Sequence, residues 1–222
     1  PNVFPRSKGP VNGLQGRYVM GALLAISRGI DAASRYVGLA AIWLVLLAAL
    51  VGAFNALFRY SIGTILYLDS KLRVFGGGLG FIFDLYRDNS NALRDVQLIM
   101  FAGMVMLGTS WTLKVNEHVR VDLVYGSVSY RKRDWIDLSG AILFLVPMCV
   151  VLIYFSWPWF LESWRTNEMS SNAGGLPRWP FKLFIPLGFA ILLVQGFSEI
   201  IKTLASLMGY IHREPNYEKP VQ

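Results

Sequence analysis

Charged residues divide this chain into a few long apolar stretches. Four stretches, each about 16 to 24 residues long, contain no Asp, Glu, Lys or Arg. These are Tyr36–Phe58, Val96–Leu113, Leu138–Leu161 and Leu183–Ser198. A transmembrane helix needs roughly 20 mostly apolar residues, so the pattern predicts an all-α membrane protein with four spans. We place the spans at about residues 37–58, 96–113, 138–159 and 182–204, since Lys182 can extend its amine toward the headgroups.

The N-terminal part, residues 1–35, precedes the first span. It begins with an arm rich in Pro, Gly and Asn and continues with apolar residues at helical spacing. This pattern predicts an interfacial amphipathic helix that lies on the membrane. Arg28 and Asp31, three residues apart, are expected to share one face of it.

The membrane domain, residues 36–210, contains one long connector between its first two spans. This connector, residues 61–91, includes the run Gly76–Gly78, and its uncharged part is too short to cross a bilayer. A flexible or partly re-entrant interfacial hairpin is predicted there. A polar tail, residues 211–222, ends the chain.

Composition strengthens the membrane interpretation. The chain is 54% hydrophobic and only 16% charged, whereas ordinary soluble domains approach about 25% charged residues. A net charge of +7 can indicate nucleic-acid binding, but in a membrane protein basic flanks facing anionic lipid explain it better. No nucleic-acid partner is therefore predicted. The single cysteine, Cys149, excludes an intramolecular disulfide and leaves no thiolate cluster for zinc or iron–sulfur binding.

The distribution of basic residues predicts the orientation. Of the 21 Lys and Arg residues, thirteen lie in the N-terminal part, the link between spans two and three, and the C-terminal part, against eight on the other side. Because cytoplasmic segments carry the excess of basic residues, both termini are predicted to be cytoplasmic.

A polar cluster follows the second span directly. Its members are Trp111, Lys114, Asn116, Glu117, His118, Arg120 and Asp122. If the helix continues, His118 and Asp122 share a face and suggest a metal or proton-relay pair. The only other histidine, His212, lies in the polar tail, which excludes a bis-histidine haem inside the membrane. The preferred hypothesis is an interfacial elbow that fixes depth and supports assembly, with no metal, cofactor or catalytic residue.

The spans themselves contain small residues rather than charges. Ala48, Gly52 and Ala56 recur every fourth residue, which predicts a stripe on which another helix packs closely. No ionisable residue lies at the centre of a span, although such residues usually mark ion pathways. We therefore expect neither an enzyme nor a chain that transports solute alone.

Two segments resemble one transporter family. The segment Trp111–Tyr125 resembles the exit of the second helix in the small membrane subunit, or DctQ component, of tripartite ATP-independent periplasmic (TRAP) transporters. His118, Arg120, Val121 and Asp122 match its His-x-Arg-Val-Asp run. Ser171–Lys202 resembles the start of that family's last helix, through Gly174, Gly175, Leu176, Pro177, Trp179 and Pro180. Arg94-Asp95 stands where many members carry a Glu.

The resemblance implies a non-catalytic small permease subunit in a bacterial inner membrane. Its partner would be a large multi-span permease that imports a carboxylate-type solute with sodium, supplied by a periplasmic solute-binding protein. Membrane lipid is the other expected partner. The alternative is a structural transmembrane subunit of another inner-membrane complex, such as an electron-transfer or photosynthetic assembly.

Overall fold

The described part of the chain folds into long helices. In this computed structural model, residues 12–72, 79–115 and 129–211 are described. The elements are α1 (Asn12–Leu72), α2 (Leu79–Val115), α4 (Tyr130–Gly140), the π-helix η1 (Ala141–Leu145), α5 (Val146–Arg165) and α6 (Trp179–Leu207). Among the described residues the only β-like pairing is an isolated bridge between Met169 and Pro177. The predicted all-α class is confirmed.

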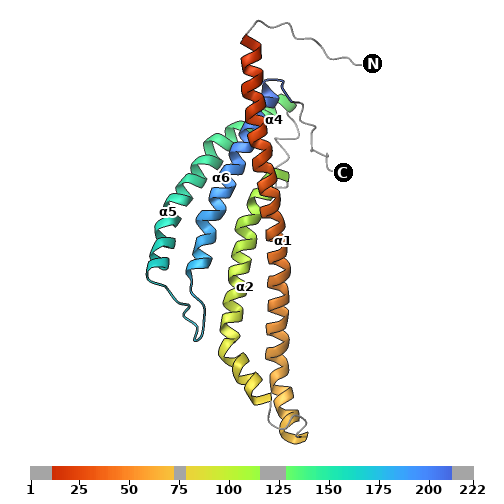
Figure 1. Ribbon diagram of the computed structural model, residues 1–222, viewed down its shortest axis with the longest axis vertical. Coiled ribbons are helices and arrows are strands. Elements are labelled where there is room, and N and C mark those ends of the chain that lie inside the picture. Colours follow the sequence, from red (N-terminus) through yellow and green to blue (C-terminus); the bar gives the residue numbers. More distant parts are fainter. Residues whose placement is uncertain (1–11, 73–78, 116–128, 212–222) are drawn as a thin grey trace, which may run out of the picture.

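Four helical segments are long and apolar enough to cross a membrane. They are Gly16–Leu68, Phe83–Val115, Arg131–Arg165 and Trp179–Leu207, and each contains one of the predicted spans. The predicted number of helices able to cross a membrane is thus confirmed for the described residues, and the span bounds stay a prediction. Figure 1 shows the start of α1, the end of α2, α4 and the end of α6 at one end of the molecule, here called the terminal end. The end of α1, the start of α2 and the α5–α6 loop lie at the other, the loop end.

The predicted N-terminal interfacial helix is not a separate element. Its residues form the first part of α1, which runs for 61 residues without a break. At 1.5 Å per residue this helix is about 90 Å long, whereas the hydrocarbon core of a bilayer is about 30 Å thick. No proline occurs between Pro10 and Pro147, so nothing in the sequence interrupts the hydrogen-bond ladder of α1.

The predicted hairpin covers residues 61–91, and its Gly run, Gly76–Gly78, lies outside the described residues. Helix α1 continues to Leu72 and α2 begins at Leu79, so most of this connector is helical. The two helices contact one another near this region: the ring of Phe58 lies 4.6 Å from that of Tyr86, centroid to centroid, and Ile62 and Leu66 line a pocket with Phe83. The Tyr86 hydroxyl donates to Asn55 Oδ1 at 2.6 Å. Helix α1 and helix α2 therefore pack on one another in this part of the chain.

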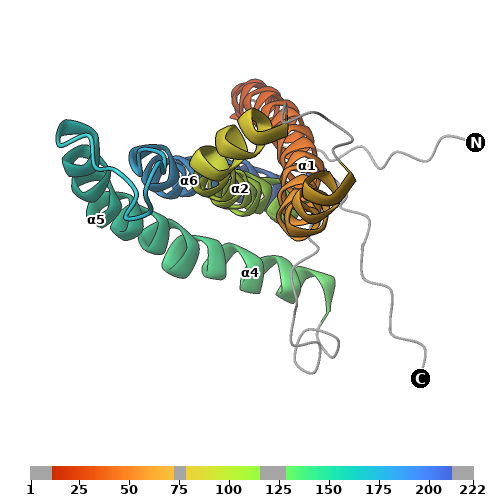
Figure 2. The same ribbon diagram turned by 90° about the horizontal axis from the view of Figure 1, so that it is seen from below.

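The helices stand in a row rather than around a shared centre. From one side to the other the order is α5, α6, α2 and α1 (Figure 1). Helix α5 packs on α6, and α6 packs also on α2 and α1. Figure 2 shows that α4 and α5 follow one curved path obliquely across this row. Most of the apolar surface of each helix stays uncovered. In Arg131–Arg165, for example, only 11% of the most apolar 18-residue stretch is buried.

Helix α1 packs along a seam with a seven-residue repeat. Its most buried positions recur at that spacing: Met20, Ser27, Ser34, Ala41 and Ala48. A repeat of seven keeps one seam of a helix facing a neighbour, as in left-handed coiled coils. The residues in this seam are mainly small, which lets the neighbouring backbones approach closely.

The path from α4 to α5 contains a π-helical turn. Residues Ala141–Leu145 adopt this wider turn directly before Pro147. Proline has no N–H to donate to the preceding turn, and π-helical turns and prolines are both common causes of helix bending. The curved path of α4 and α5 in Figure 2 thus contains a local change of helix type next to a proline.

Candidate functional site

A polar cluster joins α1 to α6 at the terminal end. We call it the α1–α6 polar cluster, and its members are Ser27, Asp31, Ser34, Gln195, Ser198, Glu199 and Lys202. On α6 these positions follow i, i+3, i+4 and i+7, and on α1 they follow i, i+4 and i+7. Both sets therefore form a stripe along one face of their helix, and the two stripes meet.

Asp31 accepts most of the bonds in this cluster. Its carboxylate accepts hydrogen bonds from Gln195 Nε2 at 2.9 Å and from the Ser198 hydroxyl at 2.9 Å. Lys202 forms an ion pair with the same carboxylate at 3.0 Å, and it also pairs with Glu199. The Asp31–Lys202 pair replaces the predicted pairing of Asp31 with Arg28, whose Nε donates to the Leu24 carbonyl.

Gln195 lies at the centre and is fully buried. Its amide oxygen accepts a hydrogen bond from Ser34 at 2.6 Å, while its amide nitrogen donates to Asp31 and Glu199. A buried amide satisfied on both sides is expensive to displace, because any shift of the helices would leave polar atoms without partners. The cluster therefore fixes the register of α1 against α6.

A second polar site lies at the loop end, where the α5–α6 loop, residues 166–178, rests on α2. Asp95 of α2 is buried and accepts a hydrogen bond from the backbone N–H of Leu176 at 3.0 Å. The Asn172 amide donates to the same carboxylate at 3.4 Å, and the Asn91 amide donates to the carbonyl of Ala173 at 3.0 Å. Helix α2 thus holds the loop by side-chain bonds to its backbone.

Two glycines permit this close contact. Gly174 has φ of +68°, and a Cβ there would lie 2.6 Å from the Asp88 carbonyl oxygen. A Cβ on Gly175 would lie 2.6 Å from Asp95 Oδ2. The left-handed backbone selects glycine at position 174, and the lack of space selects it at both positions.

Ion pairs close the base of the same loop. Glu168 pairs with the buried amine of Lys182 and also, at 3.7 Å, with Arg178. The hydrogen bond from Lys182 is the main reason why the pKa of Glu168 is lowered from its usual value. The Lys182 amine also lies 4.5 Å from the centroid of the Trp159 ring. Lys182, where the fourth span was predicted to begin, therefore points to partners within the protein, Glu168 and Trp159.

Most of the predicted elbow lies outside the described residues. This applies to Asn116, Glu117, His118, Arg120 and Asp122. Trp111 and Lys114 are described, at the end of α2. The Lys114 amine lies 4.8 Å from the Trp111 ring centroid and donates to the Asp31 carbonyl oxygen at 2.8 Å. The elbow thus begins next to the α1–α6 polar cluster.

The predicted small-residue stripe only partly faces a neighbour. Ala48 is buried, and a Cβ on Gly52 would lie 2.6 Å from Gln97 Nε2 of α2. Ala56, in contrast, is exposed. The four-residue repeat drifts around the helix, whereas the observed seam follows seven residues, and this explains why Ala56 faces away.

The residues matched to the start of the last helix lie together. Gly174, Gly175, Leu176 and Pro177 form the end of the α5–α6 loop, and Trp179 and Pro180 begin α6. Trp179 packs on Trp164 of α5 with ring centroids 4.5 Å apart. Pro180 sits in the first turn, where a missing N–H leaves no helix hydrogen bond unmade.

The sequence reasoning missed Gln195 and Asp95 as organising residues. The signal for Gln195 was present, since Gln195, Ser198, Glu199 and Lys202 form a polar stripe at helical spacing in an otherwise apolar region. Asp95 had been noted only as a difference from the family. Within the described residues, no group of three or more His, Cys, Asp or Glu side chains is placed to hold a metal ion.

Comparison with known proteins identifies the family. Residues 86–206, more than half of the chain, match the family described as "Tripartite ATP-independent periplasmic transporters, DctQ component". The matched region begins in α2 and includes the Asp95 site and nearly all of α6, while α1 lies outside it. Searches of curated proteins and of solved structures gave no match. With its four apolar helices and this match, the chain is a multi-pass membrane protein that belongs to the DctQ family of small TRAP transporter permease subunits.

Proposed function

We propose that this chain is a non-catalytic scaffold for a large multi-span permease in the inner membrane of a bacterium. The large subunit imports a carboxylate-type solute together with sodium, and a periplasmic solute-binding protein delivers that solute. Both termini of the small subunit lie in the cytoplasm, as the distribution of Lys and Arg predicts.

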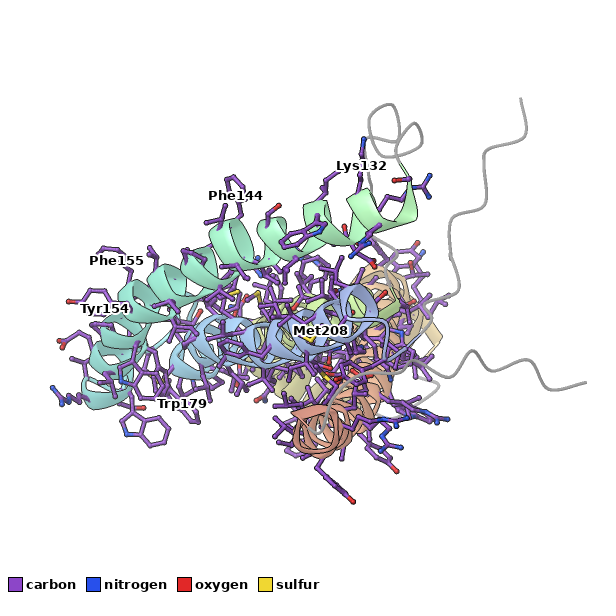
Figure 3. The ribbon with its side chains drawn as sticks, turned by 90° about the horizontal axis from the view of Figure 1, so that it is seen from above. Lys132, Phe144, Tyr154, Phe155, Trp179 and Met208 are labelled. Atoms are coloured by element: carbon purple, nitrogen blue, oxygen red, sulfur yellow. The ribbon has the colours of Figure 1, made fainter. Side chains whose placement is uncertain are left out.

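The observation that supports this role most directly is the open row of helices. A row leaves two broad apolar faces uncovered, and a membrane partner can pack on either face. Figure 3 shows Phe144 of η1 and Tyr154 and Phe155 of α5 projecting on the side away from α6. Their exposed fractions are 74%, 72% and 70%. Inside a bilayer such side chains contact either lipid or another subunit.

The polar sites support a rigid role. In the described residues, the charges of the α1–α6 polar cluster pair with one another and hold two helices together. The α5–α6 loop is held in the same manner on Asp95 and Lys182. Fully bonded polar networks favour one arrangement over its alternatives. A frame of this kind suits a subunit against which a moving partner works.

Copurification and uptake test the proposal together. The tagged full chain, purified from detergent-solubilised membranes, should bring down a large multi-span permease. Deleting the gene should abolish uptake of the solute, and the chain supplied in trans should restore it. Recovery of pigment- or haem-binding subunits instead, with uptake unchanged, would contradict the proposal and favour a different membrane complex.

Site-specific cross-linking locates the contact. A photoreactive amino acid at Phe144 of η1 or Phe155 of α5, both on the open face, should cross-link to the large subunit. The matched control is Ala205, which is fully buried in α6 and should give only cross-links within the chain. If neither open position nor others on the opposite face captures the large subunit, the scaffold role is wrong.

A further inference from the structure

A groove between α1 and α2 lies beside the α1–α6 polar cluster. It has a volume of about 420 Å³ and is lined by Arg35, Gly38, Leu39, Ile42, Trp111 and Lys114. Its floor forms because Gly38 has no side chain: a Cβ there would lie 2.9 Å from Cβ of Trp111. The tryptophan therefore packs directly on the backbone of α1, in a groove that combines apolar side chains with the guanidinium of Arg35 and the amine of Lys114.

The two basic residues of the groove mark the same membrane boundary. Arg35 immediately precedes the charge-free run of the first span, and Lys114 immediately follows that of the second. The structure brings these two sequence boundaries together in one groove. Two cations at the edge of the hydrocarbon region repel one another unless an anion lies between or beside them.

Asp31, the described acidic residue that contacts Lys114, already has a partner for its carboxylate. The Asp31 carboxylate pairs with Lys202, and Lys114 reaches only the main-chain carbonyl of Asp31, at 2.8 Å. Within the described residues, neither Arg35 nor Lys114 forms an ion pair with a carboxylate. The groove thus combines positive charge with no acidic counterpart among its lining side chains.

Below the cations the groove is apolar and open to the surroundings. Leu39 and Ile42 lie one and two turns further into the first span, with exposed fractions of 46% and 61%. Trp111 supplies the amphipathic ring that favours the headgroup level of a bilayer. A ligand that fits must therefore be anionic at one end and apolar at the other.

We propose that this groove binds one anionic phospholipid. Its phosphate lies between Arg35 and Lys114, and one acyl chain follows Leu39 and Ile42. Basic pockets between transmembrane helices recognise anionic headgroups in this manner. The site goes beyond the scaffold role and does not depend on it, because all of its lining residues belong to this chain.

Native mass spectrometry of the purified full chain tests the site. After delipidation, the chain is titrated with phosphatidylglycerol or with phosphatidylcholine of the same acyl chains. The first lipid bound should be phosphatidylglycerol in preference to phosphatidylcholine. Equal retention of the two lipids would overturn the proposal without any variant being needed, and without bearing on the scaffold role.

Variants separate a built site from diffuse attraction. Arg35→Ala should weaken binding of the first phosphatidylglycerol about fivefold, the effect of one basic residue near an anionic surface. Arg35→Lys should retain most of the affinity. The matched control is Arg28→Ala, two turns away on the same face of α1 and outside the groove. An equal loss in Arg28→Ala and Arg35→Ala, or no loss in Arg35→Ala, would contradict the proposal.

A labelling experiment gives the position of the lipid. Phosphatidylglycerol with a photoreactive group in its acyl chain should label the peptide that contains Leu39 and Ile42. The same probe should label this peptide less in Arg35→Ala, whose exposed side chain makes a folding defect easy to exclude by size-exclusion chromatography. Labelling spread evenly over the exposed apolar residues of α1 and α5 would show ordinary solvation by lipid and refute the site.

Discussion

Replacing Asp95 by alanine removes the carboxylate that holds the α5–α6 loop on α2. The bond from the Leu176 N–H, at 3.0 Å, is charge-assisted and contributes about 1.5–3 kcal/mol. The longer contact from Asn172, at 3.4 Å, adds about 0.5–1 kcal/mol. The expected loss is therefore about 2–4 kcal/mol, which corresponds to a change in the opening equilibrium of the loop of about 30- to 1000-fold.

Hydrogen exchange measured by mass spectrometry reports this opening directly. Peptides covering residues 167–178 should exchange faster in Asp95→Ala by that factor, while peptides from the centre of α1 should not change. In Asp95→Asn the exchange rate of the loop peptides should lie between those of the parent chain and Asp95→Ala. The amide oxygen can still accept a hydrogen bond from the Leu176 N–H, but without the charge.

Asp88→Ala is the matched control for Asp95→Ala. Asp88 is exposed, and its side chain makes only a surface ion pair with Arg87 at 3.7 Å. Such pairs contribute about 0–1 kcal/mol, so exchange in the loop should stay near that of the parent chain. The reasoning is refuted if Asp95→Ala leaves the exchange of residues 167–178 unchanged, or if Asp88→Ala accelerates it equally.

Three further predictions concern packing, charge and pH. Gly188→Ala should lower the free energy of unfolding in detergent by about 1–3 kcal/mol, because its Cβ would lie 2.6 Å from Met106 Cβ and 2.9 Å from the Met106 carbonyl oxygen. Gly21→Ala, with open space around it, should be neutral or stabilising. Equal melting temperatures for the two variants would contradict this prediction. Lys202→Met should lower the free energy of unfolding by about 1–3 kcal/mol, because it leaves the carboxylates of Asp31 and Glu199 together without a cation. Adding Asp31→Asn should recover part of that loss. Strictly additive effects in this double-mutant cycle would show that Asp31 and Lys202 are not coupled. Because the pKa of Glu168 is lowered in the folded protein, its ion pairs should stabilise the fold fully above the unfolded pKa of about 4.3. This stabilisation should be lost as the pH falls through the lower folded pKa. Tryptophan fluorescence should therefore be constant from neutral pH to about pH 5 and change only in stronger acid, and Glu168→Gln should remove that change; a transition near neutral pH would be inconsistent with this role.

The four spans were predictable because the relevant signal is one-dimensional. A run without charges, such as Tyr36–Phe58, has the length of a bilayer whatever the helix packs against. The length of α1 was not predictable by the same means. The residues after Arg59 mix polar and apolar side chains, and two of them, Ile62 and Leu66, face Phe83 and Tyr86 of α2 across one pocket. In proteins, packing of this kind stabilises helices more than propensity does.

The polar sites depend on contacts between distant parts of the chain. Asp95 and Leu176 are 81 positions apart, and Asp31 and Lys202 are 171 positions apart. Single-helix spacing can identify a polar stripe, as it does for Gln195–Lys202, but it cannot name the stripe that it meets. For the same reason the sequence offered Arg28, on α1 itself, as the basic neighbour of Asp31. Its actual partner, Lys202 of α6, could be identified only from the fold.

The seven-residue seam of α1 restricts how this helix can change in length. Inserting one residue would rotate everything beyond it by about 100° and turn the seam away from its neighbours. Inserting seven residues would rotate it by only about 20° after two full turns, so the seam would survive. The distance by which α1 extends beyond the bilayer is therefore adjustable in steps of about 10 Å, and intermediate lengths would break the packing. Related chains with a longer or shorter first helix should differ from this one by whole heptads.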